Sequence, residues 1–472
     1  MNNLFIGISK YLFIILMAFF VFFSFIVLAD NKKRSHKAAL FIQTMMMFIL
    51  HLAAYMVIFI NTENNTMIIF YGAQVIFLVI FRGLHDVFYE KDYNKGLLND
   101  VCMFLCISFI MLTRLDYSKA IKQFLIVCVA SVVAIIIPVI IKKYKNIVNL
   151  TYVYCFAGVA FLAIVLVIGQ ITGGAKLSVS LAGFSFQPSE FVKILYVFFI
   201  AALLNKSTSF LRVCLSAIFA GLHVIILVLS TDLGSALIFF IVYVVMIYVA
   251  TCKIRYLFAG GIGGCAAALV AYKLFSHIRI RVAAYLNPWA FIETGGYQVA
   301  QSLFAIGTGG FLGLGLYKGL PKSVPLVEQD FMFSAISEEL GGFFGICLIF
   351  LYMSCFICMI KIAMKQEVLF YKLVGVGLAV TCAVQTILTI GGAIKFIPST
   401  GVTLPLISYG GSSVLCTMIM FAIFQGLVVH AEYEEKQTSE RMMTEDFKFV
   451  GDTESLKAVK KSSRNKKKKR NM

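Results

Sequence analysis

Four carboxylates gather in the stretch VEQDFMFSAISEELGG, residues 327–342, and an apolar run with no charge before Lys361 follows them. The four acids are Glu328, Asp330, Glu338 and Glu339. A carboxylate at a dehydrating boundary has a raised pKa and can act as a general base. Acids at the start of a helix can equally well be structural, because anions stabilise a helix N-terminus. We expect the structural role, capping or pairing with basic loop residues, for the last two acids.

Two other segments place charges beside long apolar runs. In QPSEFVK, Glu190 and Lys193 are three positions apart, so they share one helical face and can pair. The pair would either anchor a helix end or form the polar floor of a cavity. In STDLGSA, Asp232 is a good helix N-cap. It could also present a second carboxylate to the same cavity, and the two roles are compatible.

A fourth segment, GVTLPLISYGGSS (401–413), combines hydroxyls with paired glycines. Gly410 and Gly411 allow a close backbone approach or a positive φ, and Ser408 and Tyr409 add hydroxyl groups. Free N–H groups at such a helix start can bind phosphate or pyrophosphate. The alternative is a re-entrant turn that packs against its neighbours.

These polar groups stand out because the chain is otherwise strongly apolar. Of its 472 residues 60% are hydrophobic and 14% are charged, and its mean hydropathy is +0.91. A membrane-spanning helix needs about 20 mostly apolar residues, whereas β-barrel strands alternate over about ten. The sequence therefore predicts an all-α polytopic membrane protein with about 13 transmembrane helices. The expected spans are residues 11–28, 38–60, 67–82, 97–113, 121–141, 149–170, 190–205, 209–229, 233–250, 256–274, 333–361, 369–391 and 411–430.

Basic residues in the short loops predict the orientation, because cytoplasmic loops are enriched in Lys and Arg. Four basic loops would share the cytoplasmic face: 31–37, 142–145, 252–255 and 361–367. With a cytoplasmic C-terminus and an odd number of spans, the N-terminus would be outside. One loop on the outer face, with Arg114, Lys119 and Lys122, disagrees with this assignment.

The net charge of +18 is concentrated in the tail, where nine basic residues and no acids follow from Lys457 onward. Such a tail is a solvated cytoplasmic segment or a binder of anionic membrane lipids. Nothing in it indicates a nucleic-acid partner.

The order of the motifs resembles the SEDS family of cell-wall proteins, the FtsW/RodA/SpoVE group. The motifs are QPSEFVK, TDLGSA, YLNPWAF…GGYQVAQSLFAIGTGGFLGLGL, DFMFSAISEELG and PSTGVTLPLISYGGSS. The resemblance implies a ten-span catalytic core at 97–430 with a large extracellular loop at 275–332. Residues 1–96 would be an additional three-span region with a cytoplasmic linker, and 431–472 a basic cytoplasmic tail.

The resemblance also implies a peptidoglycan glycosyltransferase. Such enzymes polymerise lipid II into glycan strands at the outer face of the cytoplasmic membrane, in cell elongation, division or sporulation, together with a class B penicillin-binding protein transpeptidase. The family's essential aspartate matches Asp330. Its cavity glutamate and lysine match Glu190 and Lys193, and the aspartate of its PDLGT element matches Asp232.

Glycosyl transfer from a pyrophosphate needs a base, positive charge for the leaving group and aligned sugars. We assign the base to Asp330. Lys193, Arg281 or a bound Mg²⁺ or Mn²⁺ would serve the pyrophosphate, with Glu190 and Asp232 orienting the lysine or the metal; Asp330 and Asp232 are the candidate metal ligands. The alternative functions are a flippase or transporter of lipid-linked precursors and a non-enzymatic scaffold for a transpeptidase.

Overall fold

A computed structural model gives the structure of the chain. It describes residues 2–29, 33–89, 92–172, 175–181 and 184–438. Twelve helices in these ranges are long and apolar enough to cross a membrane. A thirteenth, α6, contains a shorter apolar stretch. Every predicted span therefore falls on a helix, and the protein has the fold of a multi-pass membrane protein.

The first six helices are α1 (Asn2–Ala29), α2 (Lys33–Thr62), α3 (Thr66–Tyr89), α4 (Lys95–Leu115), α5 (Tyr117–Lys143) and α6 (Thr151–Ile168). They are followed by α7 (Pro188–Lys206), α8 (Phe210–Leu229), α9 (Leu233–Thr251), α10 (Ile254–Leu274), α11 (Ser276–Leu286) and α12 (Tyr297–Gly309). The described part of the chain ends with α13 (Met332–Glu339), α14 (Gly342–Met364), α15 (Leu369–Ala393) and a last helix, Gly411–Thr438.

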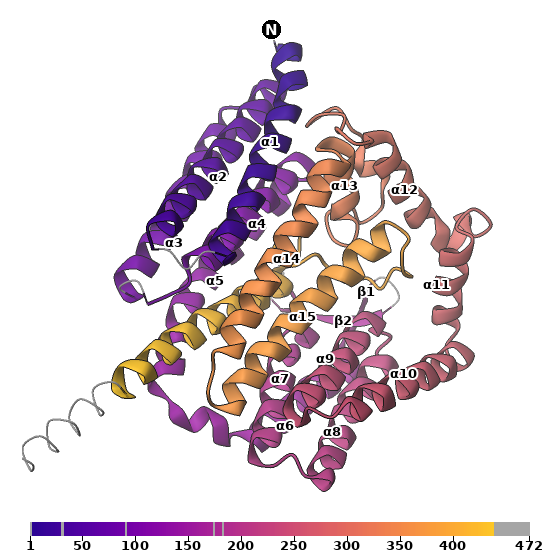
Figure 1. Ribbon diagram of the computed structural model, residues 1–472. Coiled ribbons are helices and arrows are strands. Elements are labelled where there is room, and N and C mark those ends of the chain that lie inside the picture. Colours follow the sequence, from indigo (N-terminus) through magenta and orange to yellow (C-terminus); the bar gives the residue numbers. More distant parts are fainter. Residues whose placement is uncertain (1, 30–32, 90–91, 173–174, 182–183, 439–472) are drawn as a thin grey trace, which may run out of the picture.

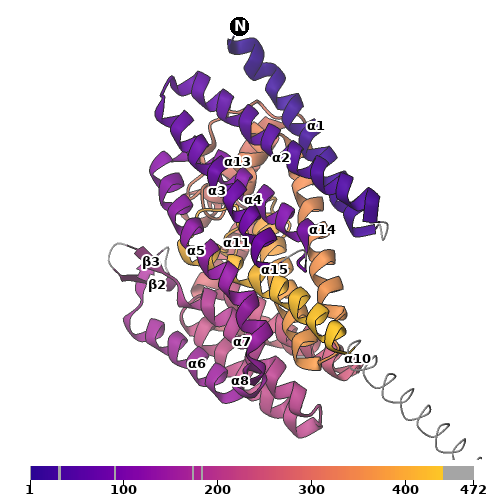
Figure 2. The same cartoon turned by 90° about the vertical axis from the view of Figure 1, so that its left-hand side faces the viewer.

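The helices form one bundle in which α1, α2 and α3 lie on one side and α6, α8 and α10 on the other (Figure 1). The N-terminal end of α1 and the far end of the last helix lie at opposite ends of the bundle in Figures 1 and 2. α4 is surrounded by other helices and its apolar stretch is fully buried, whereas no residue in that of α10 is buried. A helix that is apolar on all sides is suited to either position, in the centre of a bundle or facing lipid.

One predicted span is wrong in its extent. Residues 333–361 were expected to form one helix, but the chain breaks after Leu340 and forms two, α13 and α14. Gly341 lies at the break with φ of +99°, a conformation that side chains rarely adopt. A Cβ atom at Gly341 would come within 2.6 Å of the backbone nitrogen of Gly313. The break exists because two backbone segments pack directly against each other there.

The predicted all-α class is confirmed, and the described residues add one small antiparallel sheet of order β1-β2-β3. Its strands are β1 (Gln170–Thr172), β2 (Ala175–Leu181) and β3 (Phe184–Phe186). It connects α6 to α7 and lies at the edge of the bundle (Figure 2).

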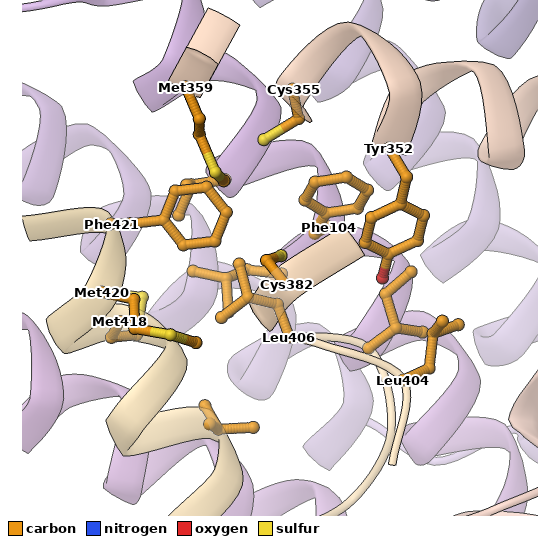
Figure 3. Close-up of a cluster of buried hydrophobic side chains, with 14 of the residues drawn as sticks. Phe104, Tyr352, Cys355, Met359, Cys382, Leu404, Leu406, Met418, Met420 and Phe421 are labelled. Atoms are coloured by element: carbon orange, nitrogen blue, oxygen red, sulfur yellow. The ribbon is translucent and has the colours of Figure 1, made fainter. Parts of the chain in front are cut away.

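A buried apolar cluster fixes the segment at 401–413 to the bundle (Figure 3). The ring of Tyr352 on α14 stacks on that of Phe104 on α4, with centroids 4.3 Å apart. The hydroxyl of Tyr352 donates a hydrogen bond of 2.6 Å to the carbonyl of Pro405. Leu404 and Leu406 pack into the same cluster from either side of that proline. Two helices thus hold the turn by packing and by one buried hydrogen bond.

Candidate active site

Asp330 lies in the loop that leads into α13, and residues distant in sequence hold this loop. The carbonyl of Glu328 accepts a hydrogen bond of 2.7 Å from the amide of Tyr409. The hydroxyl of Ser408 donates to the carbonyl of Gln329. The two segments therefore run side by side immediately before the aspartate, and the segment at 408–409 positions its backbone.

Arg281 on α11 lies beside Asp330, with Gly401 between them. Gly401 has φ of +74°, and a Cβ atom there would lie 3.8 Å from Oδ2 of Asp330 and 3.9 Å from Nη2 of Arg281. Nη1 of Arg281 donates to the carbonyl of Ser399 at 3.2 Å, which fixes the guanidinium. A carboxylate and a guanidinium thus face the same small space beside an exposed glycine.

The surroundings of Asp330 favour its protonated form. Burial raises the pKa of Asp330 to about 6. The positive charge of Arg281 partly offsets this effect, and the negative charge of Glu328 adds to it. A carboxyl group with this pKa is ionised at neutral pH but is a stronger base than an ordinary aspartate.

Glu190 and Lys193 form the predicted ion pair on α7. Nζ of Lys193 lies 2.8 Å from Oε2 of Glu190, and the side chains are only 1% and 3% exposed. The same ammonium donates to Oε1 of Gln385 on α15 at 2.7 Å. Nε2 of Gln385 donates in turn to the carbonyl of Thr403 at 3.0 Å. The buried pair is therefore connected through Gln385 to the 401–413 segment.

Asp232 has the capping role that its sequence predicted. Its Oδ1 accepts the backbone N–H of Ser235 at 3.1 Å, which caps α9. Its Oδ2 accepts a hydrogen bond of 3.1 Å from the hydroxyl of Ser189 on α7. Asp232 thereby connects the start of α9 to the start of α7, the helix that carries Glu190 and Lys193.

The turn at 408–411 packs against α5. Nε2 of Gln123 donates to the carbonyl of Ser408 at 3.0 Å, and its Oε1 accepts from the amide of Gly410 at 3.3 Å. A Cβ atom on Gly411 would lie 3.0 Å from Ile126. The packed-turn interpretation is confirmed, and anion binding by this turn stays a prediction.

Our sequence analysis missed Gln123 and Gln385, both fully buried in apolar helices. Gln123 uses both of its amide atoms to hold the backbone of Ser408 and Gly410. Gln385 uses its nitrogen to hold the carbonyl of Thr403, and its oxygen accepts from Lys193. A lone amide side chain inside an apolar span could have indicated both residues, because a buried amide needs hydrogen-bond partners.

The last two acids of the opening stretch are structural, as expected. Glu339 forms an ion pair of 2.9 Å with Arg114, which also donates to the carbonyl of Gly319 at 3.2 Å. Glu338 accepts the backbone N–H of Leu320 at 2.8 Å. Both carboxylates therefore fasten the 310–331 loop to α13. Burial raises the pKa of Glu339 to about 7, against the lowering effect of Arg114.

The same contacts explain the basic loop that disagreed with the predicted orientation. Arg114 pairs with Glu339, and Lys119 pairs with Glu328. Two of its three basic residues are thus neutralised, one by Glu328 in the loop before α13 and one by Glu339 at the end of α13. A count of Lys and Arg alone overestimates the charge of this loop.

We expect Arg114→Gln to destabilise the protein more than Glu339→Gln. The first variant leaves Glu339 buried without its cation, which typically costs about 3–5 kcal/mol. The second leaves Arg114, whose side chain is 13% exposed, with its hydrogen bond to the carbonyl of Gly319. Thermal unfolding in detergent measures both, and the control is Lys122→Gln, which changes an exposed basic residue on α5. Equal losses in the two variants would contradict this account of the pair.

The described part of the chain contains no group of three or more His, Cys, Asp or Glu side chains that could hold a metal ion. Both oxygens of Asp232 already accept hydrogen bonds. Asp330 is therefore the better single ligand of the two, and the predicted Mg²⁺ or Mn²⁺ stays a prediction.

Comparison with known proteins shows the family to which the chain belongs. Residues 96–434 match the model of the FtsW/RodA/SpoVE family, described as cell cycle proteins. The chain belongs to this family. The FtsW/RodA/SpoVE match begins after α3, so the first three helices lie outside it.

Curated members of the FtsW/RodA/SpoVE family cover most of the chain. It is 30% identical to the peptidoglycan glycosyltransferase RodA of Mycobacterium leprae, over 79% of this chain and 86% of the relative. It is 33% identical to the stage V sporulation protein E of Bacillus subtilis, over 60% of this chain and 80% of the relative.

Solved structures share the fold. A chain from the work "Structural coordination of polymerization and crosslinking by a peptidoglycan synthase complex" aligns with a TM-score of 0.61 and 26% identity, covering 72% of this chain and 98% of that one. The crystal structure of Thermus thermophilus RodA aligns with a TM-score of 0.54 and 24% identity, over 71% of this chain and 96% of that one.

Proposed function

We propose that this protein is a peptidoglycan glycosyltransferase that polymerises lipid II into glycan strands, in cell elongation, division or sporulation. The observation that carries the proposal is the family match. It covers the residues that place Asp330 and Arg281 beside the same small space. The names of the relatives RodA and FtsW, which describe peptidoglycan glycosyltransferases, support it.

In this proposal Asp330 takes the proton from the 4-hydroxyl of the attacking sugar. The oxygen of that hydroxyl forms the new glycosidic bond to the anomeric carbon of the second lipid-linked sugar. The bond from that carbon to the pyrophosphate breaks, and undecaprenyl pyrophosphate leaves with the electron pair. A half-buried carboxylate fits the first step, because partial dehydration makes it more basic.

Arg281 is the proposed partner of the pyrophosphate. Its guanidinium is half-buried, lies beside Asp330 and presents a planar array of donors that suits phosphate oxygens. Lys193 is fully buried in its contacts with Glu190 and Gln385. For Lys193 we therefore favour an indirect role, in holding the 401–413 segment. A Mg²⁺ or Mn²⁺ ion at Asp330 would supply further positive charge to the pyrophosphate.

We also propose an orientation and a partner. Asp330 and the N-terminus would lie outside and the C-terminus in the cytoplasm, an assignment supported by the ion pairs that neutralise Arg114 and Lys119. The partner would be a class B penicillin-binding protein. The likeness to a chain of a peptidoglycan synthase complex that coordinates polymerization and crosslinking supports this choice.

The pH dependence of the polymerisation rate should report the ionisation of Asp330. A general base must be ionised, so the rate should fall about tenfold per pH unit below the pKa of about 6. For an ordinary aspartate this fall would begin only near pH 4. Initial rates measured against pH give the midpoint directly.

Glu328→Gln sharpens this pH test. The negative charge of Glu328 raises the pKa of Asp330, and the substitution also releases the positive charge of Lys119 from its partner. Both changes should move the acid midpoint to lower pH. A midpoint near pH 4 in the wild type, or an upward shift in the variant, would argue against Asp330 as the base.

Reconstitution separates the proposal from the transporter alternative. Proteoliposomes would carry fluorescent lipid II, the protein and its transpeptidase partner. The glycosyltransferase should convert lipid II on one face into strands that run as a ladder on a gel. A transporter would move lipid II across the bilayer, as seen by quenching from outside, without forming any ladder.

A further inference from the structure

A cavity of about 50 Å³, lined by both polar and apolar side chains, lies where α1 and α2 meet α4 and α14. A cavity needs roughly 10–15 Å³ to hold one water molecule, so this one has room for an ion together with water. Its walls combine two helices that precede the family match with two that belong to it. α1 lies along α14 in Figures 1 and 2. The cavity thus lies at the interface between the additional helices and the family core.

Asp100 on α4 lines this cavity and is 3% exposed. Its Oδ1 accepts a hydrogen bond of 3.1 Å from the hydroxyl of Ser24 on α1. None of the ion pairs among the described residues includes Asp100. Arg82, also in this region, donates instead to Asn99 and Thr44. A buried carboxylate without a cation is costly, so Asp100 is either protonated or paired with a cation that the neighbouring side chains do not supply.

Neutral oxygen donors surround the same space. The hydroxyl of Ser354 on α14 lines the cavity, is 1% exposed and has no hydrogen-bond partner in the described part of the chain. The hydroxyl of Ser24 accepts Nε2 of Gln43 at 2.7 Å, which keeps an oxygen beside Asp100. Carboxylate and hydroxyl oxygens suit hard cations. A single carboxylate balances one positive charge.

We propose that this cavity binds one small monovalent cation, with the carboxylate of Asp100 and the hydroxyls of Ser24 and Ser354 as ligands. These three groups come from α4, α1 and α14. Bound cation therefore connects the additional helices to the family core and stabilises their docking. This site is separate from Asp330 and does not depend on the proposed glycosyl transfer.

The test measures thermal unfolding of the full-length protein in detergent. The buffers contain increasing NaCl or KCl, with N-methylglucamine chloride holding the ionic strength and the pH constant. The wild type should show a rise in Tm that saturates with Na⁺ or K⁺. Asp100→Asn, which keeps the shape and the acceptor for Ser24, should abolish the rise. Glu63→Gln, which neutralises an exposed acid far from the cavity, should leave it unchanged.

Ser354→Ala keeps the test decisive if Asp100→Asn fails to fold. It preserves the carboxylate and removes one ligand, so the half-saturating cation concentration should increase severalfold. Binding of radioactive ²²Na⁺ to the purified wild type and to Ser354→Ala gives an independent readout. A wild type with the same Tm in alkali and N-methylglucamine chloride would overturn the proposal, because the cavity would then hold water alone. A rise that persists in Asp100→Asn, or a half-saturation unchanged in Ser354→Ala, would also overturn it.

Discussion

Asp330→Asn should reduce the rate of glycan polymerisation by about 10²- to 10⁴-fold, the usual contribution of a general base. The amide has the shape of the carboxylate but cannot take the proton of the attacking hydroxyl. Because Asp330 is half-buried with its backbone held by Ser408 and Tyr409, the variant should fold normally. Initial rates with purified protein, partner and lipid II give the effect, and the unchanged Tm shows that folding is intact.

Glu293→Gln is the matched control for this experiment. Glu293 is an exposed acid in the same 275–332 segment, so the substitution removes the same charge without touching the site. It should polymerise at the wild-type rate. If Asp330→Asn is as active as Glu293→Gln, then Asp330 is not the base.

Lys193→Met should cause the largest loss of stability among the site variants. It leaves Glu190 buried at 3% exposure without its cation, which typically costs about 3–5 kcal/mol. It also removes the donor to Gln385, and with it the connection to Thr403. Thermal unfolding should show a large fall in Tm, whereas Lys206→Met, at the exposed end of the same helix, should show little change.

The double variant Glu190→Gln/Lys193→Met distinguishes stability from function. It removes both buried charges, so much of the lost Tm should return. If polymerisation also returns, the pair is structural. If folding returns without activity, the pair is needed for the reaction. A single Lys193→Met variant with wild-type stability would contradict the description of the pair as a buried ion pair.

Much of this architecture was predictable from the sequence because hydropathy and short-range spacing determine it. The spans follow from apolar length, the pair of Glu190 and Lys193 from their spacing of three, and the cap at Asp232 from its residue type before a helix. These features depend on neighbours within about one helical turn or on the membrane itself.

The remaining features depend on contacts between distant segments. The break at Gly341 exists because the backbone of Gly313 lies against it, and Arg281 and Asp330 lie on either side of Gly401 although they are far apart in the sequence. Neither of these two close approaches can be predicted from the sequence pattern. The same holds for Gln385, whose amide connects α7 to the 401–413 segment across the bundle.

The additional N-terminal region has one feature that the sequence predicts and one that depends on a contact between distant segments. Its three spans were evident from hydropathy, but the contact between Ser24 and Asp100 crosses 76 positions of sequence. An aspartate in an apolar span is a recognisable signal for a buried polar site. Its partner helix, however, could only be found from the packing of α1 on the core.

The most direct test of the central claim is polymerisation of lipid II by the purified wild-type protein with its transpeptidase partner in detergent. The partner's own transpeptidase activity is blocked by a β-lactam, and no vesicle is present. Our account predicts glycan strands that form a ladder on a gel with the wild type and not with Asp330→Asn. A wild-type protein that folds, binds its partner and leaves lipid II unpolymerised would contradict it.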